Sequence, residues 1–542
     1  MASPTKSANA GEHDASAKAR VDGMKEPYWE ASQSSGQMSS FGLTEDELAL
    51  EKKLRWKIDL MIMPLIVWTY LMNYIDRNNY AAARLQGLEA DLNLTDTQYQ
   101  IGLSVLFITY VLAQVPSNMM LNHIGKPAYY LGFFTVAWGL VSALTALVQN
   151  FAGIIACRLV LGLVEAPFFP GVSIISSSLQ LYIYSHRHKV IFYLSKWYTK
   201  KELSLRMALF YNGSLIAGAF GNLIAAGILK GLDKTHGISA WRWLYILEGV
   251  VTVATGILIC LVLPDFPESW RALSPELQRV ATKRLAVDAA ESDVDETRGP
   301  RAQFEGIKMA LRDPKVWILT VAYHAFVGAG GFQNFFPSLT RTLGFDDTVS
   351  LLLVAPPYVF MAFYCAFHSW LSDRVQNRFW FFMYPIPIVI AGCVIFMTTT
   401  AFGPRYFSLF LLNFVFTMNG TTYAWMSTCV PRPPAKRAAA LGFMNAVGNA
   451  ASIWTSYTYF DAQGDRYPVA LGIVIALLGV SAVGGVWQRW ILVRENKRLE
   501  RLENEDVVVG DKEMQRLGET ADVEGVDVGT ARQRQKGFRY LI

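Results

Sequence analysis

An arginine and a glutamate, Arg158 and Glu165, interrupt an otherwise apolar stretch of the sequence. They are seven residues apart, about two helical turns, so on a helix both side chains share one face. An ionised side chain at the middle of a bilayer costs about 2.5–3.5 kcal/mol on insertion scales, so such residues usually face a polar interior and serve a function. A permanent cation beside a titratable carboxylate predicts an anion site coupled to a proton site. The alternative is a buried ion pair that stabilises helix packing.

A second polar group, Asp76, Arg77 and Asn79, comes at the end of the first long apolar run. Arginine keeps its charge at any working pH and binds carboxylates through two parallel hydrogen bonds, so Arg77 is a candidate anion ligand. Asn79 is a second candidate substrate ligand, and Asp76 is a candidate proton acceptor. If the helix ends before these residues, they lie instead at the extracellular surface.

Further residues are candidates for the wall of a substrate cleft. Gln114 shares a helix face with two other polar residues, so these side chains either line a cavity or satisfy one another. His324 is a lone histidine in an apolar run, and a core histidine with satisfied hydrogen bonds is the simpler interpretation; a binding role is the alternative. Gln333 and Asn334 follow closely on glycines, where a helix can break and expose its backbone to a ligand.

The composition places the chain among polytopic membrane proteins. Of 542 residues, 52% are hydrophobic and only 17% are charged, against about 25% charged in ordinary soluble domains. The basic residues are spread over loops, which argues against a nucleic-acid partner. The five cysteines lie in apolar runs without zinc-ligand spacing, so we expect no metal, cofactor or disulfide. The sequence has no P-loop motif, which argues against an ATP-driven pump.

Twelve apolar runs of about 20 residues predict an all-α membrane protein with twelve transmembrane helices. A hydrophilic stretch separates the sixth run from the seventh, so the helices form two halves of six. The N-terminal stretch lacks the apolar core of a signal peptide and is expected to be disordered. The predicted parts are a tail over residues 1–50, a first half over 51–264, a linker over 265–313, a second half over 314–493 and a tail over 494–542.

The distribution of Lys and Arg predicts the orientation. Cytoplasmic loops of membrane proteins collect these residues. Predicted loops on the side of the N-terminus contain Lys196, Lys200 and Lys201 among other basic residues, whereas the opposite loops are poorer in them. Both termini are therefore expected in the cytoplasm.

Two six-helix halves joined by a cytoplasmic linker match the plan of the major facilitator fold, whose substrate site lies near the mid-membrane between the halves. The stretch from Ser369 to Arg378, which includes Asp373 and Arg374, resembles the superfamily's loop motif after the second helix of each half. Its counterpart in the first half, residues 117–126, lacks the acidic residue. Either copy alone is better explained as a basic loop, but two copies at equivalent positions favour the superfamily.

A more specific resemblance is carried by short motifs at residues 73–83, 110–118, 158–166, 241–249, 431–437 and 445–449. From about Asp59 to Trp490 the chain resembles the fungal anion:cation symporters, which include allantoate, nicotinate, pantothenate and biotin permeases. The first-helix arginine and the Arg-x-x-x-Gly-x-x-Glu spacing are also similar to the vesicular glutamate and sialic acid transporters. The resemblance implies that Arg77 and Arg158 serve the anion and that Glu165 participates in proton coupling.

These observations predict a transporter rather than an enzyme, which imports a small organic anion with protons by alternating access. We expect a monomer in the lipid bilayer of the fungal plasma membrane. The alternatives are an efflux transporter of metabolites or drugs and a nutrient sensor that no longer transports. Gly218 is followed by Ala219, whereas drug antiporters usually carry a Gly-Pro step there, and this departure weakens the efflux alternative.

One stretch does not fit the family pattern. Residues 172–189 lengthen the joint between the fourth and fifth helices, where this fold usually has a short connection. Two explanations stay open: a genuine basic surface loop, or an in-frame intron retained in the coding sequence.

Overall fold

The chain is all-helical over the part that the computed structural model describes, with no strand in that part. The side chains of some helical stretches, including 114–124 and 200–212, are not described. The described residues are 45–124, 126–167, 197–198, 200–265, 267, 270, 272–293, 300–504, 511–524, 528–529 and 539–541.

The first half consists of six long helices preceded by α2 (Glu45–Met61). Proline stands in the first turn of two of them, where its missing N–H is not needed. Asn150 caps another by accepting a hydrogen bond from the Gly153 N–H at 2.9 Å. The six are α3 (Met63–Leu85), α5 (Asp96–Ile124), α6 (Pro127–Thr145), α7 (Phe151–Glu165), α9 (Lys200–Leu232) and α10 (Ala240–Val262).

The second half also consists of six helical rods, but several are interrupted by short segments. The first breaks at Gly330, where glycine weakens the helix, and the third restarts at Pro385, which has no backbone N–H to donate. The rods are α13 (Pro314–Ala329) with η5 (Gly330–Phe335) and α14 (Phe336–Arg341); α15 (Asp347–Val375); α16 (Arg378–Met383) with α17 (Pro385–Thr398); α18 (Phe402–Leu412) with η6 (Asn413–Phe416) and α19 (Thr417–Cys429); α20 (Pro434–Asn449) with α21 (Ala451–Thr455) and η7 (Ser456–Thr458); and α22 (Pro468–Asn504).

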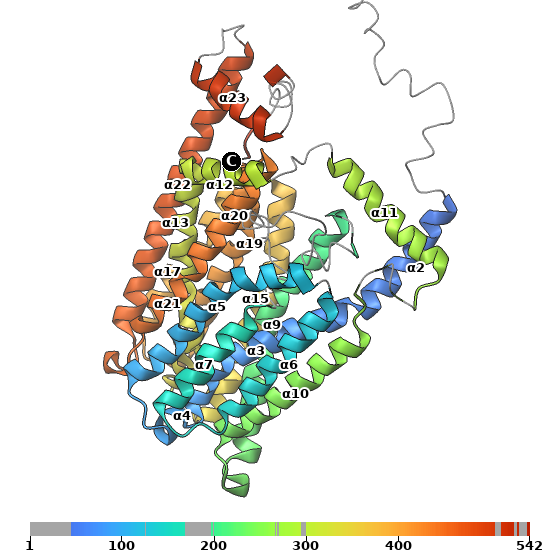
Figure 1. Ribbon diagram of the computed structural model, residues 1–542. Coiled ribbons are helices and arrows are strands. Elements are labelled where there is room, and N and C mark those ends of the chain that lie inside the picture. The colour runs from blue at the N-terminus through green and yellow to red at the C-terminus, as the bar shows by residue number, and fades with distance from the viewer. Residues whose placement is uncertain are drawn as a thin grey trace, which may run out of the picture.

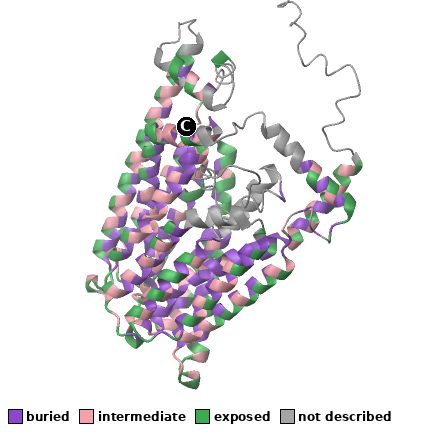
Figure 2. Cartoon of the chain, viewed as in Figure 1, coloured by how far each residue is buried: buried purple, intermediate pink, exposed green. Residues whose placement is uncertain are grey.

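The helices form one elongated bundle (Figure 1). Seven of the described helices are long and apolar enough to cross a membrane. Exposed residues, green in Figure 2, recur along the outer helices and at the ends of the bundle, and buried residues, purple, recur along the helices between them. We call the end that carries α2 and the helices α11 (Pro275–Asp293), α12 (Pro300–Arg312) and α23 (Asp511–Glu524) the linker end. The opposite end, which carries α4 (Leu88–Asp91) and η4 (Thr235–Gly237), is the loop end.

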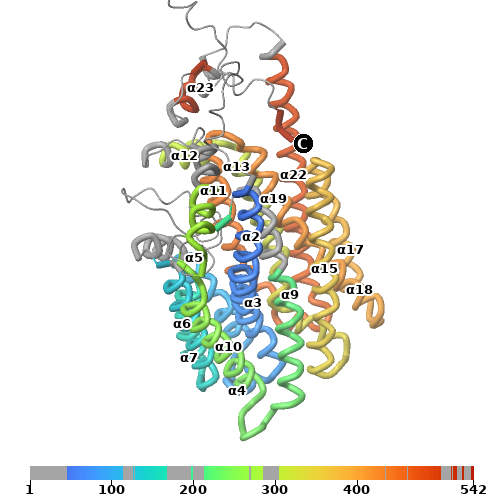
Figure 3. Tube along the Cα trace, turned by 90° about the vertical axis from the view of Figure 1, so that its right-hand side faces the viewer, coloured from blue at the N-terminus to red at the C-terminus, as the bar shows by residue number. Residues whose placement is uncertain are grey.

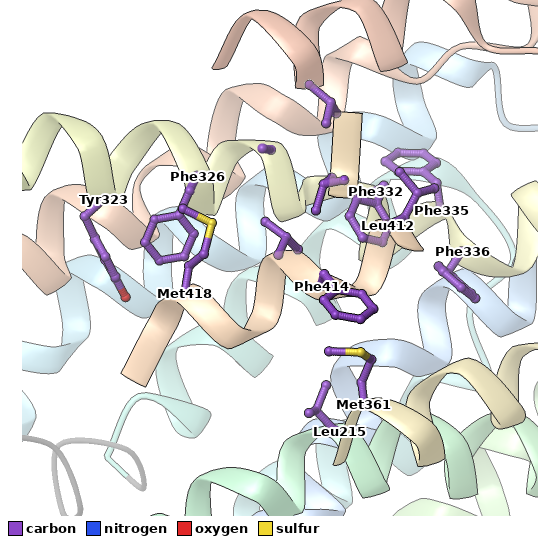
Figure 4. Close-up of a cluster of buried hydrophobic side chains, with 14 of the residues drawn as sticks. Leu215, Tyr323, Phe326, Phe332, Phe335, Phe336, Met361, Leu412, Phe414 and Met418 are labelled. Carbon is purple, nitrogen blue, oxygen red and sulfur yellow. The ribbon is translucent and has the colours of Figure 1, made fainter. Parts of the chain in front are cut away.

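The two halves pack together along α9 and α15, which run side by side in the turned view (Figure 3). Leu215 of α9 reaches the apolar cluster of the second half beside Met361 of α15 (Figure 4). Toward the loop end, the Gln100 side chain donates to the Tyr459 carbonyl at 2.6 Å, and the Ser104 hydroxyl donates to the Ile453 carbonyl at 2.7 Å. These bonds tie α5 to the last turns of the α20–α21–η7 rod.

An aromatic stack reinforces the junction at the loop end. Tyr80 lies parallel to Tyr99 with ring centroids 4.5 Å apart, and Tyr99 meets Phe335 edge-on at 6.2 Å. Phe335 in turn stacks on Tyr459 at 4.6 Å. Aromatic pairs at these separations are favourable beyond their area burial. The stack therefore links α3 of the first half to the broken rods of the second half.

Some helix ends differ from the sequence prediction, with consequences for the site. The sequence left open that the first helix ends before Asp76 and Arg77, but α3 begins at Met63 and continues to Leu85. Asp76 and Arg77 consequently lie well inside a helix and not at its exposed end. Within the linker predicted over 265–313, Pro275–Asp293 form the helix α11.

Candidate functional site

The first element of the candidate site is an ion pair between α3 and α7. Arg77 Nε lies 2.8 Å from Glu165 Oε1, and the Glu165 side chain is only 1% exposed. The Asn73 amide donates to the same carboxylate oxygen at 2.5 Å. Glu165 Oε2 and Arg77 Nη2 have no hydrogen-bond partner in the described part of the chain. Each partner therefore retains an unused polar atom, and the pair is not the closed bidentate form.

Arg158, two turns before Glu165 on α7, has a different environment. Its side chain is 3% exposed, and its guanidinium carbon lies 3.8 Å from the centre of the Tyr80 ring. Its Nε and Nη2 atoms have no hydrogen-bond partner, and no carboxylate lies within ion-pair distance among the residues that the structure describes. The Arg158–Glu165 pair considered from the sequence is therefore replaced by an Arg77–Glu165 pair, which leaves Arg158 without a counter-ion. A cation–π contact does not neutralise its charge.

The close approach of α7 to α5 depends on Gly162, between these two charged residues. A Cβ atom at Gly162 would collide with the Leu106 carbonyl and the Thr109 side chain of α5. Small residues allow this kind of backbone contact between membrane helices. Gly162 thus helps to place Arg158 and Glu165 in the interior of the first half.

Asp76 lies in a neutral hydrogen-bonded environment. Its carboxylate accepts a bond from the Trp138 indole N–H and one at 2.9 Å from the Ser142 hydroxyl. The Asn79 amide approaches it at 3.5 Å and also donates to the Glu248 carboxylate. Glu248, which accepts this bond, lies in the middle of α10. Asp76 and Asn79 therefore belong to one cluster, separate from the Arg77–Glu165 pair.

Two further predicted residues are Gln114 of the first half and His324 of α13. Gln114 lies on α5, but its side chain is outside the described residues. His324 Nδ1 lies 2.7 Å from the Val447 carbonyl, and its Nε2 accepts from the Trp454 indole at 3.2 Å. A carbonyl only accepts and an indole N–H only donates, so these bonds define one neutral tautomer of His324. Both ring nitrogens are engaged, as expected for a core histidine.

Gln333 and Asn334 lie in η5, at the break in the α13–η5–α14 rod that the glycines predict. Both side chains are half-buried, and neither amide makes a hydrogen bond within the described part of the chain. Gly331 packs against Thr455 of α21, so the break lies beside the adjoining rod. The structure places these two residues in the second half and does not bring them into contact with Arg158 or Glu165.

Sequence reasoning missed a network of uncharged side chains in the second half. The Tyr323 hydroxyl donates to Asn419 at 3.1 Å and lies 3.1 Å from the Tyr423 hydroxyl. Tyr423 in turn donates to Asn445, whose own Nδ2 is buried without a partner in the described region. The Tyr323 hydroxyl points away from the apolar cluster around it (Figure 4). The four-residue spacing of Asn419 and Tyr423 was a usable signal, because it places both on one helix face.

The face of α19 that carries this network is polar in its exposed part. Asn419 is exposed and Tyr423 is half-buried on α19. On α15, by contrast, the exposed side chains include Phe360, Phe363 and Phe367. Lipid does not satisfy an amide, so the face that carries Asn419 points to a water-accessible interior, whereas the phenylalanines face lipid.

The loop-motif residues form a local structure at the linker end of α15. Arg378 lies 2.7 Å from Asp373 and donates to the Ser372 hydroxyl at 2.8 Å. The Arg374 guanidinium lies 5.5 Å from the Trp370 ring centre. Gln376, with φ of 58°, ends the helix in the left-handed conformation. The Asp373–Arg378 pair therefore spans the tight turn into α16.

The sequence of the chain is similar to those of known transporters. A family model described as Major Facilitator Superfamily matches residues 66–179 and 190–456. The unmatched interval lies within residues 172–189, the stretch that lengthens the joint between the fourth and fifth helices. This stretch is outside the described residues. Among similar sequences, the MFS-type transporter cnsO of Penicillium expansum is 31% identical over 466 residues, 83% of this chain and 85% of that protein. The major facilitator-type transporter hxnP of Emericella nidulans is 26% identical, over 86% of this chain and 91% of that protein.

Solved structures give the same fold. A D-xylose–proton symporter superposes with a TM-score of 0.57 at 13% identity, over 79% of this chain and 96% of the symporter. A bacterial homologue of the human lysosomal transporter Spinster gives 0.56 at 14% identity, over 79% of this chain and 95% of that one. The prediction of an all-α membrane protein with the major facilitator fold is confirmed.

Proposed function

Because the chain belongs to the Major Facilitator Superfamily, we propose that it imports a small organic anion together with protons across the fungal plasma membrane. Its termini are then cytoplasmic, and within the superfamily it is a fungal anion:cation symporter of the allantoate, nicotinate and pantothenate permease type. The observation that carries the proposal is the Arg158 guanidinium, which is 3% exposed and has no carboxylate partner within the described residues. A buried cation without a counter-ion is costly, and an anionic substrate removes that cost.

The substrate class follows from the chemistry of the arginines. A guanidinium offers a planar set of donors that matches a carboxylate, and two of the Arg158 nitrogens are unused. Tyr80 packs on one face of the guanidinium at 3.8 Å, while the buried Nε and Nη2 atoms at its edge keep unused donors. A small carboxylate is therefore the preferred ligand, and Arg158 is its main anchor.

Proton coupling follows from the Arg77–Glu165 pair. While Glu165 is ionised, it occupies Arg77 at 2.8 Å. Protonation of Glu165 removes its charge, so the attraction to Arg77 weakens and the guanidinium becomes available to the substrate carboxylate. Proton binding and anion binding thus favour each other through Arg77, and the loaded cleft is less charged when the carrier reorients.

Uptake measurements test the proposal. Labelled nicotinate, pantothenate, allantoate and dipeptides are offered to yeast that lacks the corresponding permeases and expresses this chain. We expect saturable uptake of at least one carboxylate, faster at acidic external pH and lost when the proton gradient is collapsed. Arg158→Ala should abolish it, whereas Arg466→Ala, which removes a guanidinium from an exposed loop, serves as the matched control.

Two results would overturn the proposal. One is uptake of the same carboxylate by Arg158→Ala at the wild-type rate and comparable surface expression. The other is accumulation that does not respond to the proton gradient.

A further inference from the structure

Glu248 is a buried carboxyl group that the proposed transport cycle does not use. It lies in the middle of α10 and is 5% exposed. The Asn79 amide donates to its Oε2, while its Oε1 has no hydrogen-bond partner within the described residues. No basic side chain of the described part of the chain lies within ion-pair distance of it. An ionised carboxylate in this position would be poorly stabilised.

Asp76, on the facing helix α3, has more hydrogen-bond donors around it than Glu248. Trp138 and Ser142 of α6 both donate to it, and Asn79 approaches it from its own helix. Hydrogen bonds to the charged form of a carboxyl group favour that form. The difference in donors assigns the negative charge to Asp76 and the neutral form to Glu248.

Asn79 connects these two carboxyl groups. Its Nδ2 atom donates to Glu248 and lies 3.5 Å from Asp76 Oδ1, so one amide nitrogen lies between the two acids. Two ionised carboxylates this close in a low-dielectric interior repel each other, and one of them takes up a proton. A metal ion would bind the amide oxygen, but the amide presents its N–H to both acids, which favours a proton over a cation.

The surroundings contain few other charges. Of the helices around Glu248, α3 presents Asp76, α10 presents Tyr245, and α6 presents only neutral donors. Arg158 of α7 is the basic residue whose charge reaches this cluster, where it interacts with Asp76 and Tyr245.

We propose that Glu248 binds a proton in this conformation, and that Asp76, Asn79 and Glu248 form a second proton site of the carrier, distinct from Glu165. The proposal deepens the proton coupling proposed above without depending on the identity of the substrate. When Glu248 loses its proton, the cluster gains a negative charge. Asn79, which donates to Glu248, lies on α3, the helix that also carries Arg77, so this change in charge acts on α3.

Infrared spectroscopy tests the proposal without a transport substrate. The purified full-length chain is reconstituted in lipid nanodiscs, and the carbonyl band of protonated carboxylic acids is recorded as a function of pH. We expect a band that persists at neutral pH and is lost in Glu248→Gln. Glu165→Gln is the matched control and should retain the band, because ion-paired Glu165 contributes a carboxylate and not a carboxylic acid.

A second variant keeps the test valid if Glu248→Gln does not fold. Asp76→Asn removes the neighbouring negative charge, so the Glu248 proton should be released at a lower pH than in the wild type. An unchanged band in folded Glu248→Gln, or a band lost in Glu165→Gln instead, overturns the proposal. So does a band that disappears when sodium replaces choline, because the site then binds a cation. None of these results bears on anion binding by Arg158, so the two proposals fail separately.

Discussion

The two halves of the molecule have the same number of membrane helices but very different interiors. The interior of the first half contains acidic and basic residues at positions 76, 77, 158, 165 and 248. Among the described residues of the second half, Lys, Arg, Asp and Glu lie toward the ends of the rods, apart from Arg489 of α22, whose guanidinium lies 4.4 Å from the centre of the Phe379 ring. Its interior polar groups are hydroxyls, amides and imidazoles, as in the contact of His368 with Tyr384 and Thr421.

This difference indicates a division of labour. Charged groups respond to protons and bind an anion, so coupling belongs to the first half. Neutral donors and acceptors recognise shape and hydrogen-bonding pattern at lower cost of burial. The second half is therefore suited to select among anions by the uncharged part of the molecule, and the following predictions test this comparison.

The largest effect is expected at Arg158. Arg158→Lys keeps the charge but loses the planar fork of donors. Charge-assisted hydrogen bonds contribute about 1.5–3 kcal/mol, so loss of one should raise the apparent KM for the anion about 10- to 100-fold. Concentration-dependent uptake with the carboxylate identified in the panel measures this. A near-normal KM in the lysine variant would mean that charge alone suffices and that the fork geometry is not used.

The next effect concerns Glu165, whose charge is expected to control coupling. Glu165→Gln leaves an acceptor for Asn73 but mimics the protonated acid permanently. We expect accumulation against a gradient to be lost while exchange of internal for external substrate survives at least partly. Vesicles with an imposed pH gradient, compared with counterflow in the same preparation, separate the two activities.

Glu276→Gln, on the exposed face of α11, is the matched control for removal of a carboxylate. Concentrative uptake at the wild-type level by the Glu165 variant would show that Glu165 does not carry the coupling proton.

A smaller effect is expected in the second half at Tyr423. Tyr423→Phe removes a hydroxyl that donates to Asn445 and contacts Tyr323. A neutral hydrogen bond contributes about 0.5–1.5 kcal/mol, so the apparent KM should change about 2- to 10-fold while the dependence on the proton gradient stays unchanged. Tyr406→Phe removes a hydroxyl of the same half that bonds to the Leu353 carbonyl outside this network, and it is the control. Loss of coupling in the Tyr423 variant would contradict the division of labour.

The fold was largely predictable, because hydrophobic runs of membrane length determine which segments span a bilayer. The ends of the helices were less predictable. Arg77 interrupts hydrophobicity but not helical hydrogen bonding, so α3 continues past it to Leu85. The break at Gly330 was predictable because glycine is a known weak point of a helix.

The site was predictable in its residues and less so in its pairings. Arg158 and Glu165 were visible as charges in an apolar run, but their partners come from other helices. Whether Glu165 meets Arg158 or Arg77 depends on how α3 packs against α7, which no spacing within one helix determines. The neutral network around Tyr423 was missed because tyrosines and asparagines are common in membrane helices, and only their three-dimensional contacts distinguish this group.

The smallest effect is expected at His324, the histidine of α13. Both of its ring nitrogens bond to neighbours, Nδ1 to the Val447 carbonyl and Nε2 to the Trp454 indole. These contacts belong to the packing of α13 against the α20–α21–η7 rod and lie outside the Tyr423 network. His324→Leu should leave the pH dependence of uptake where it is in the wild type. It should also lower thermal stability slightly, because the hydrogen bonds to the Val447 carbonyl and the Trp454 indole are lost, at about 0.5–1.5 kcal/mol each. Uptake across a pH series, together with a detergent-stability assay, measures both. A pH profile shifted by this variant would show that the second half carries a proton site of its own, and the contrast between a charged and a neutral half would no longer hold.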